Sequence, residues 1–149
     1  MLRFFLLTLL LQVSMLAAVP AADDPQRFVV QLPERWQEAK VRLVLEGVRV
    51  PGNVPLKLRV TAMGEDNKEV FLGSIGVEAI GPSHTETRQL QTLQLDVTRS
   101  LKRLLEQQPN RRDVDLLIRA VDGRNNPIHD LKWSIESVCL VAQENPRDS

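Results

Sequence analysis

The chain has 149 residues, in which 19 basic residues balance 19 acidic ones, and 43% of the residues are hydrophobic. A neutral balance argues against a nucleic-acid partner, which needs a basic surface, and against an electrostatic grip on anionic lipid. The length suits a single domain that buries a core without disulfide or metal staples.

The first 22 residues have the order of a secretory signal peptide. Arg3 precedes an almost unbroken apolar run from Phe4 to Leu11, and small alanines then lead to an acidic pair at 23–24. The run is shorter than the roughly 20 residues of a membrane-spanning helix. We therefore expect cleavage after residue 22, a periplasmic or secreted mature chain, and no membrane association after cleavage.

Alternation of apolar and polar residues dominates the mature chain, and this pattern is typical of half-buried strands. Seven such segments are separated by turn-forming residues, among them a predicted hairpin turn at 64–67. The segments are residues 28–32, 41–45, 56–61, 70–80, 93–97, 114–121 and 133–141. This spacing predicts an antiparallel β-sandwich.

One segment changes its period from two to that of a helix. Leu101, Leu104 and Leu105 share one helical face, Thr98 is a suitable N-cap, and Pro109 follows the end. We therefore predict an all-β antiparallel sandwich of about seven strands, with one helix of about three turns between the fifth and sixth strands. By residue number, we expect a signal peptide at 1–22, an N-terminal strand and linker at 23–39, the sandwich at 40–142 and a disordered tail at 143–149.

The inward positions of these elements predict the hydrophobic core. We expect it to contain Val41, Leu43, Leu45, Leu58, Val60, Leu95, Leu101, Leu104, Leu116, Ile118 and Ile135. The single cysteine, Cys139, stands between Val138 and Leu140 and is expected to be a small buried residue. A disulfide between chains is the alternative, because one cysteine cannot form an internal bridge. Without further evidence for association, we expect a monomer.

Residue types that carry catalysis or bind metals are sparse. His84 and His129 both fall in predicted loops, where an exposed histidine is the ordinary outcome. A metal site on both would need further ligands such as Cys139. Ser74 directly follows Gly73, which is not the spacing of a nucleophile elbow. We therefore expect no catalytic residue, no cofactor, no metal site and no enzymatic activity.

Several segments from residue 71 onward follow a recognisable order. Phe71-Leu72-Gly73-Ser74-Ile75 precedes a loop, residues 93–98 lead straight into the helix, and residues 113–121 form the next apolar strand. In this order the chain resembles the C-terminal β-sandwich domain of tyrosinases and plant polyphenol oxidases, over roughly residues 40–140. The chain departs from that family at Arg42, where the opening strand has Asp, and it contains no Tyr. We also expect that no catalytic domain is attached.

The resemblance implies a domain that carries no chemistry of its own. In that family the sandwich lies over the dicopper site of the catalytic domain and keeps the proenzyme latent, often through an aromatic side chain in the substrate pocket. The chain is therefore expected to be an exported accessory protein that binds or assists a dicopper oxidase in trans. The candidate partner contacts are Phe71, His84 and His129.

Three alternatives remain open. Phe71 alternates with Val70 and Leu72, which favours a core position for its ring over a partner contact. The chain is alternatively an extracytoplasmic ligand-binding module, which would need a concave pocket with converging polar groups. A metal-handling protein would need His84, His129 and Cys139 to converge.

Overall fold

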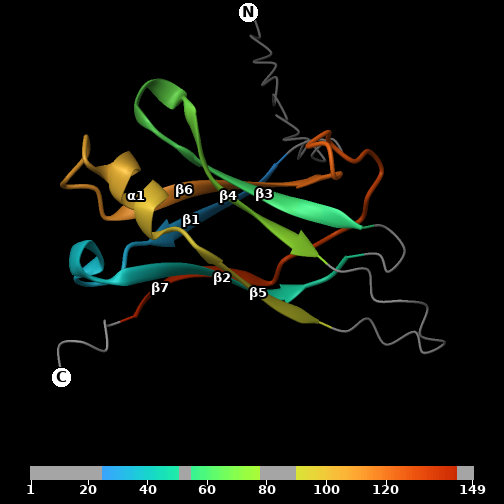
Figure 1. The fold of residues 1–149 in the computed structure, drawn as a ribbon, viewed down its shortest axis with the longest axis horizontal. Coiled ribbons are helices and arrows are strands. Elements are labelled where there is room, and N and C mark those ends of the chain that lie inside the picture. The colour runs from blue at the N-terminus through green and yellow to red at the C-terminus, as the bar shows by residue number, and fades with distance from the viewer. Residues whose placement is uncertain (1–24, 51–54, 78–89, 144–149) are drawn as a thin grey trace, which may run out of the picture.

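The computed structural model describes residues 25–50, 55–77 and 90–143, so the expected signal peptide, most of the expected tail and His84 lie outside the described residues. Two antiparallel sheets pack face to face (Figure 1), one with the strand order β1-β6-β3-β4 and the other with the order β5-β2-β7. Within the described residues the strands are β1 (Gln26–Gln31), β2 (Lys40–Val48), β3 (Leu56–Met63), β4 (Glu69–Val77), β5 (Gln91–Asp96), β6 (Asp113–Val121) and β7 (Ser137–Gln143). The predicted sandwich of seven strands is confirmed.

The single helix of the described chain, α1 (Thr98–Leu105), lies between β5 and β6, as predicted, and its leucines point into the core. It is shorter than the three turns expected, and Thr98 is its first residue rather than its N-cap. The Thr98 hydroxyl donates a hydrogen bond to Asp96 Oδ1 at 2.6 Å and accepts one from the N–H of Val41 at 2.9 Å. Thr98 therefore ties the start of the helix to β2 instead of capping its own N–H groups.

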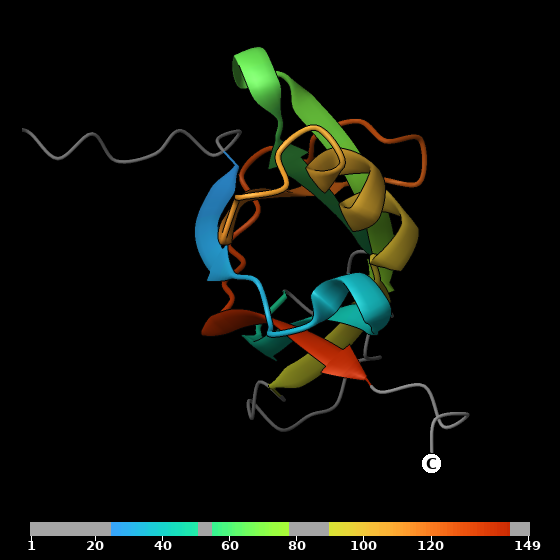
Figure 2. The ribbon, with the colours of Figure 1, turned by 90° about the vertical axis from the view of Figure 1, so that its left-hand side faces the viewer.

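At each side of the sandwich, an edge strand of one sheet lies against an edge strand of the other sheet. β1 contacts β7 on one side, β4 contacts β5 on the other, and α1 packs on β4 and β2 (Figure 2). Short 3-10 turns lie at Trp36–Glu38, before β2, and at Glu65–Asn67, where the predicted hairpin turn joins β3 to β4. The last predicted strand begins late, at Ser137. Before it, Ser134 forms an isolated bridge with Arg49, just after β2, and the N–H of Glu136 donates to the C=O of Glu46 on β2.

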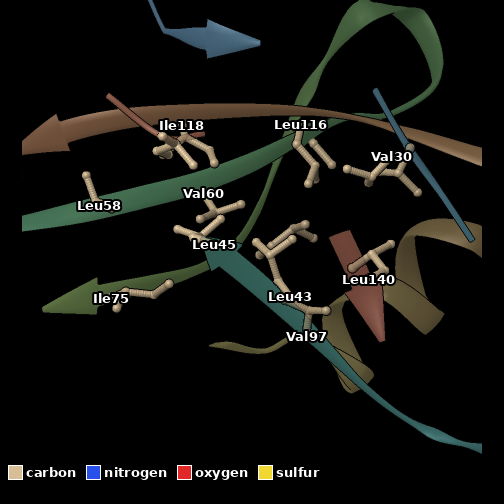
Figure 3. Close-up of a cluster of buried hydrophobic side chains, with 14 of the residues drawn as sticks. Val30, Leu43, Leu45, Leu58, Val60, Ile75, Val97, Leu116, Ile118 and Leu140 are labelled. Atoms are coloured by element: carbon tan, nitrogen blue, oxygen red, sulfur yellow. The ribbon is translucent and has the colours of Figure 1, made fainter. Parts of the chain in front are cut away.

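The core fills the space between the two sheets (Figure 3). Ten of the eleven predicted core residues are buried; nine of them come from both sheets and from α1, and Ile135 comes from the segment before β7. Leu95 is the exception: it is half-buried and packs at the margin of the core. The side chain of Leu95 lies against Gly73 on the neighbouring sheet, so the edge of the sandwich covers only part of it.

A β-bulge in β4 decides which of its side chains face the core. Val60 pairs with Gly73 and Thr61 pairs with Phe71, so Leu72 is an extra residue in β4. Val70 and Leu72 face inward on one side of the bulge, and Phe71 between them faces outward with 51% of its surface exposed. The expectation of a core position for Phe71 is therefore wrong, because the alternation that buries its two neighbours turns its ring to the opposite face of the sheet.

Truncation of a core leucine tests the shared core. Leu116→Ala removes a fully buried side chain, and we expect it to lower the free energy of unfolding by about 2–5 kcal/mol in urea denaturation. Leu90→Ala is the matched control, since Leu90 is 50% exposed and its loss should change stability by less than about 0.5 kcal/mol. Equal denaturation midpoints for the two variants would remove Leu116 from the core.

Substitution of Gly73 tests the bulge. A Cβ atom at this position would lie 2.8 Å from Leu95 Cδ2, and the residue has a φ of 158°. We expect Gly73→Ala to destabilise the protein by about 1–3 kcal/mol, measured by thermal and urea denaturation. Gly76→Ala is the control in the same strand, because nothing lies within 4 Å of the added methyl group. Similar stability of the two variants would contradict a close approach at the bulge.

Candidate functional site

The exposed aromatic ring of Phe71 lies on the outward face of the four-stranded sheet. One row of paired residues crosses this face from Arg27 on β1, through Leu117 and Thr61, to Phe71 on the edge strand β4. Leu117 and Thr61 are buried, whereas Phe71 at the end of the row protrudes. We call the cluster around this ring the Phe71 face; it consists of Arg59, Thr61, Glu69, Phe71 and Arg119.

Arg59 holds its guanidinium over the Phe71 ring. The guanidinium carbon lies 4.7 Å from the ring centroid, which is the geometry of a cation–π contact. Arg59 on β3 pairs in register with Arg119 on β6, so two cations lie side by side next to the ring. Aromatic residues and arginine are both enriched in protein–protein interfaces.

A second arginine, Arg119, forms an ion pair across the face. Arg119 reaches over β3 to Glu69 on β4, with Nη1–Oε2 and Nη2–Oε1 distances of 2.8 Å each. The Thr61 hydroxyl lies beneath this pair and donates to Glu69 Oε2 at 3.2 Å. The hydrogen bond from Arg119 holds the pKa of Glu69 below its usual range. Glu69 neutralises Arg119, and the Phe71 face contains no second carboxylate to balance Arg59. The Phe71 face therefore carries a net positive charge.

A similar ion pair lies on the same face of the sheet, at the edge formed by β1. Arg27 on β1 binds Asp115 on β6, with both carboxylate oxygens of Asp115 accepting from its Nε at 2.8 and 2.9 Å. This hydrogen bonding holds the pKa of Asp115 below its usual range. Two ion pairs therefore fix charged groups on this sheet surface, where Phe71 and Val29 are exposed apolar side chains and Phe71 is the aromatic one.

The structure describes two of the three candidate contacts named from the sequence, and they lie on different parts of the molecule. Phe71 lies on the face described above. His129 is exposed in the connection between β6 and β7, where Ile128 pairs back onto Ala120 near the far end of β6. His84 lies outside the described residues. In the described ranges no three residues of the His, Cys, Asp and Glu types cluster closely enough to hold a metal ion.

Cys139 is exposed, so the expectation of a buried cysteine is wrong. Its neighbours Val138 and Leu140 turn toward the core, and the two-residue period of β7 places Cys139 on the outer face, where it pairs with Val44. The alternation alone predicts this orientation. The frequent burial of free cysteines in other proteins is a weaker indicator than the neighbouring residues of the strand.

Arg59, Glu69 and Arg119 were not recognised from the sequence. Glu69 and Arg119 are 50 positions apart in the chain, and only the pairing of β3 with both β4 and β6 brings them together. The sequence does show polar residues at alternate positions of β3 and β6. That pattern identifies an outward face but not which cation lies over which ring.

A shallow groove lies beside the start of α1. It has a volume of about 610 Å³ and is lined by Glu38, Ala39, Lys40, Asp96, Thr98, Arg99, Ser100 and Lys102. Hydrogen bonds from the Thr98 hydroxyl and N–H hold the pKa of Asp96 below its usual range, and Lys40 Nζ lies 3.6 Å from the same carboxylate. Asp96 and Thr98 are therefore already bonded to groups of the chain itself.

No protein-family model matches the chain, and no curated protein matches it. The likeness to the tyrosinase domain therefore stays a prediction from the order of motifs. Within the three described stretches, no helix is long and apolar enough to cross a membrane.

The Arg119–Glu69 pair makes stability depend on pH in a specific direction. Because the pKa of Glu69 is lowered in the folded state, the pair stabilises the protein above the unfolded value near pH 4.3 and this contribution is lost as pH falls through the folded pKa. We expect Glu69→Gln to be less stable than the parent protein at pH 7, by less than about 1 kcal/mol because the pair is partly exposed.

The difference in melting temperature between parent and Glu69→Gln should shrink as the pH is lowered from 7 to 3. Arg119→Gln should show the same trend, and the double variant should lose no more stability than the more harmful single change, since both remove one interaction. A difference that stays constant between pH 7 and pH 3 would contradict the ion pair.

Proposed function

We propose that this chain is an exported, non-enzymatic accessory protein that binds a protein partner through the Phe71 face. The observation that carries the proposal is the half-exposed Phe71 ring with the guanidinium of Arg59 stacked on it. The signal-like N-terminus supports the export, and the scarcity of catalytic residue types in the sequence supports a binding role.

The rigidity of the Phe71 face favours binding. The bidentate Arg119–Glu69 pair and the stacked Arg59 fix side chains that would otherwise lose rotamer freedom when a partner docks. A fixed, half-exposed ring next to an uncompensated cation suits a partner with an apolar pocket rimmed by carboxylates.

The motif order suggests the identity of the partner. The Phe71 strand is β4, the strand-to-helix step is β5 followed by α1, and the next apolar strand is β6, which is the order that resembles the tyrosinase domain. We propose a dicopper oxidase as the partner, with Phe71 placed at its substrate entrance as an aromatic plug.

A ligand-binding module is the second candidate, and the groove beside α1 is the observation in its favour. It ranks second because Asp96, one of the two acidic residues that line it, is already bonded to Thr98 and Lys40. A ligand there would have to replace those bonds, whereas the Phe71 ring is half-exposed.

Capture of the partner tests the proposal. Mature chain, residues 23–149, is immobilised and incubated with the exported fraction of its own host, and retained proteins are identified by mass spectrometry. We expect a dicopper oxidase to be retained by the parent protein, and Phe71→Ser to weaken its binding by roughly 30-fold or more, the loss typical of an interface hot spot.

Two further variants test the Phe71 face as the binding site independently of the identity of the partner. Leu90→Ser removes another half-exposed apolar side chain and should leave binding unchanged, while Arg59→Gln should weaken it. Retention of the oxidase by Phe71→Ser as well as by the parent would overturn the Phe71 face as the site. Absence of any copper oxidase from the parent eluate would overturn the proposed partner.

A further inference from the structure

The strand β7 is an edge that lacks the usual protection against pairing. In the described chain it is the last strand of the three-stranded sheet and pairs only with β2. Its sequence, SVCLVAQ, has no charge and no proline, whereas β1 carries Arg27, β4 carries Glu69 and a bulge, and β5 carries Asp96. Charges, prolines and bulges are the devices that keep edge strands from pairing with other chains.

The direction of the backbone groups of β7 follows from those of β2. The N–H of Val41 binds Thr98 Oγ1 and its C=O accepts from the N–H of Val97, so Val41 directs both groups toward β5. Backbone groups alternate along a strand, so Val44 directs its own toward β7, where its partner is Cys139. The C=O of Glu46, two residues after Val44, also points to the β7 side of β2, because it accepts a hydrogen bond from the N–H of Glu136.

Cys139 therefore directs its N–H and C=O toward β2, while Val138, Leu140 and Ala142 direct theirs to the free edge. A second β7 strand, antiparallel and related by a two-fold axis at Cys139, would hydrogen-bond through Val138 and Leu140. The two Cys139 residues would then form a non-hydrogen-bonded pair, with Cα atoms about 4.5 Å apart. This separation is within the range that a disulfide spans.

The charges of β2 favour a second copy in this orientation. Glu46 pairs with Ser137 and Arg42 pairs with Val141, so the outer face next to β7 is acidic at one end and basic at the other. The two-fold axis would place Ser137 opposite Val141 of the second copy, and Glu46 would share a row with Arg42 of that copy. In the described residues neither of these two side chains has an ion-pair partner within 4.0 Å. Arg42 donates to Gln94 Oε1 at 3.2 Å, and Glu46 Oε2 accepts from the Ser137 hydroxyl at 3.2 Å.

We propose that the free edge of β7 pairs with the same edge of a second copy of this chain, antiparallel and about a two-fold axis at Cys139. The two three-stranded sheets become one continuous sheet of six strands. Glu46 and Arg42 of opposite copies then lie in one row with opposite charges, about three strand spacings, or ~14 Å, apart at their Cα atoms.

An oxidant converts this contact into a covalent one. Thiol–disulfide exchange with an oxidised dithiol joins the two Cys139 sulfurs: the two thiols give up two protons and two electrons, and the oxidant leaves as two thiols. The proposed dimer replaces the monomer that we expected by default. It leaves the Phe71 face open, because that face belongs to the outer surface of the other sheet.

The first experiment measures the register of the pairing. Mature chains carrying Cys139→Ser with Ser137→Cys, and Cys139→Ser with Val141→Cys, are oxidised with oxidised glutathione separately and as a mixture, and run on a non-reducing gel. The proposed axis pairs 137 with 141, so the mixture should give at least ten times more disulfide-linked dimer than either variant alone. Equal dimer from each variant alone, or none from the mixture, would overturn the register.

The second experiment measures the association without a disulfide. Sedimentation equilibrium under reducing conditions compares Cys139→Ser with Cys139→Lys, which places two like charges opposite each other at the axis. We expect a dissociation constant at least ten-fold weaker for Cys139→Lys, with unchanged circular dichroism for both because the side chain faces solvent. Equal dissociation constants, or monomer alone for Cys139→Ser at millimolar concentration, would overturn the pairing.

Discussion

The burial of alternate side chains between two antiparallel sheets is the constraint on which the other features of this protein depend. Leu43, Leu58 and Leu116 are fully buried and come from three different strands in both sheets. Apolar surface removed from water stabilises the fold by roughly 25 cal/mol per Å², so shifting any of these strands by one residue would expose its whole inward set. The same constraint assigns every intervening residue to an outer face.

Phe71 and Cys139 owe their exposure to this assignment. Each lies between two inward-facing apolar neighbours, and each therefore points to solvent on the outside of its own sheet. Their positions are as strongly determined as those of the core leucines, because turning either one inward would turn its neighbours outward. An exposed aromatic and an exposed thiol are in this sense consequences of the core, held in place by the same free energy.

The parts of the structure that the sequence predicts are those with a local signal. Alternation identified the strands, and the spacing of Leu101, Leu104 and Leu105 identified the helix. The Phe71 face has no such signal, since it depends on the pairing of β3 with β4 and β6, including a bulge whose extra residue shifts the register at Gly73. The exposure of Phe71 and of Cys139 does have a local signal, because each lies between two inward-facing apolar neighbours.

The two sheets differ in the surfaces that they present, and each surface suits a different kind of contact. The four-stranded sheet presents fixed charges and one ring, which suits recognition of a different protein by side chains. The three-stranded sheet ends in an uncharged strand, which suits pairing through the backbone. Because the two contacts use different sheets, a dimer would carry two Phe71 faces at once. A partner that is itself multimeric, or concentrated on a surface, would then be bound more tightly by the dimer than by one face alone, since the second contact forms at the high effective concentration set by the first.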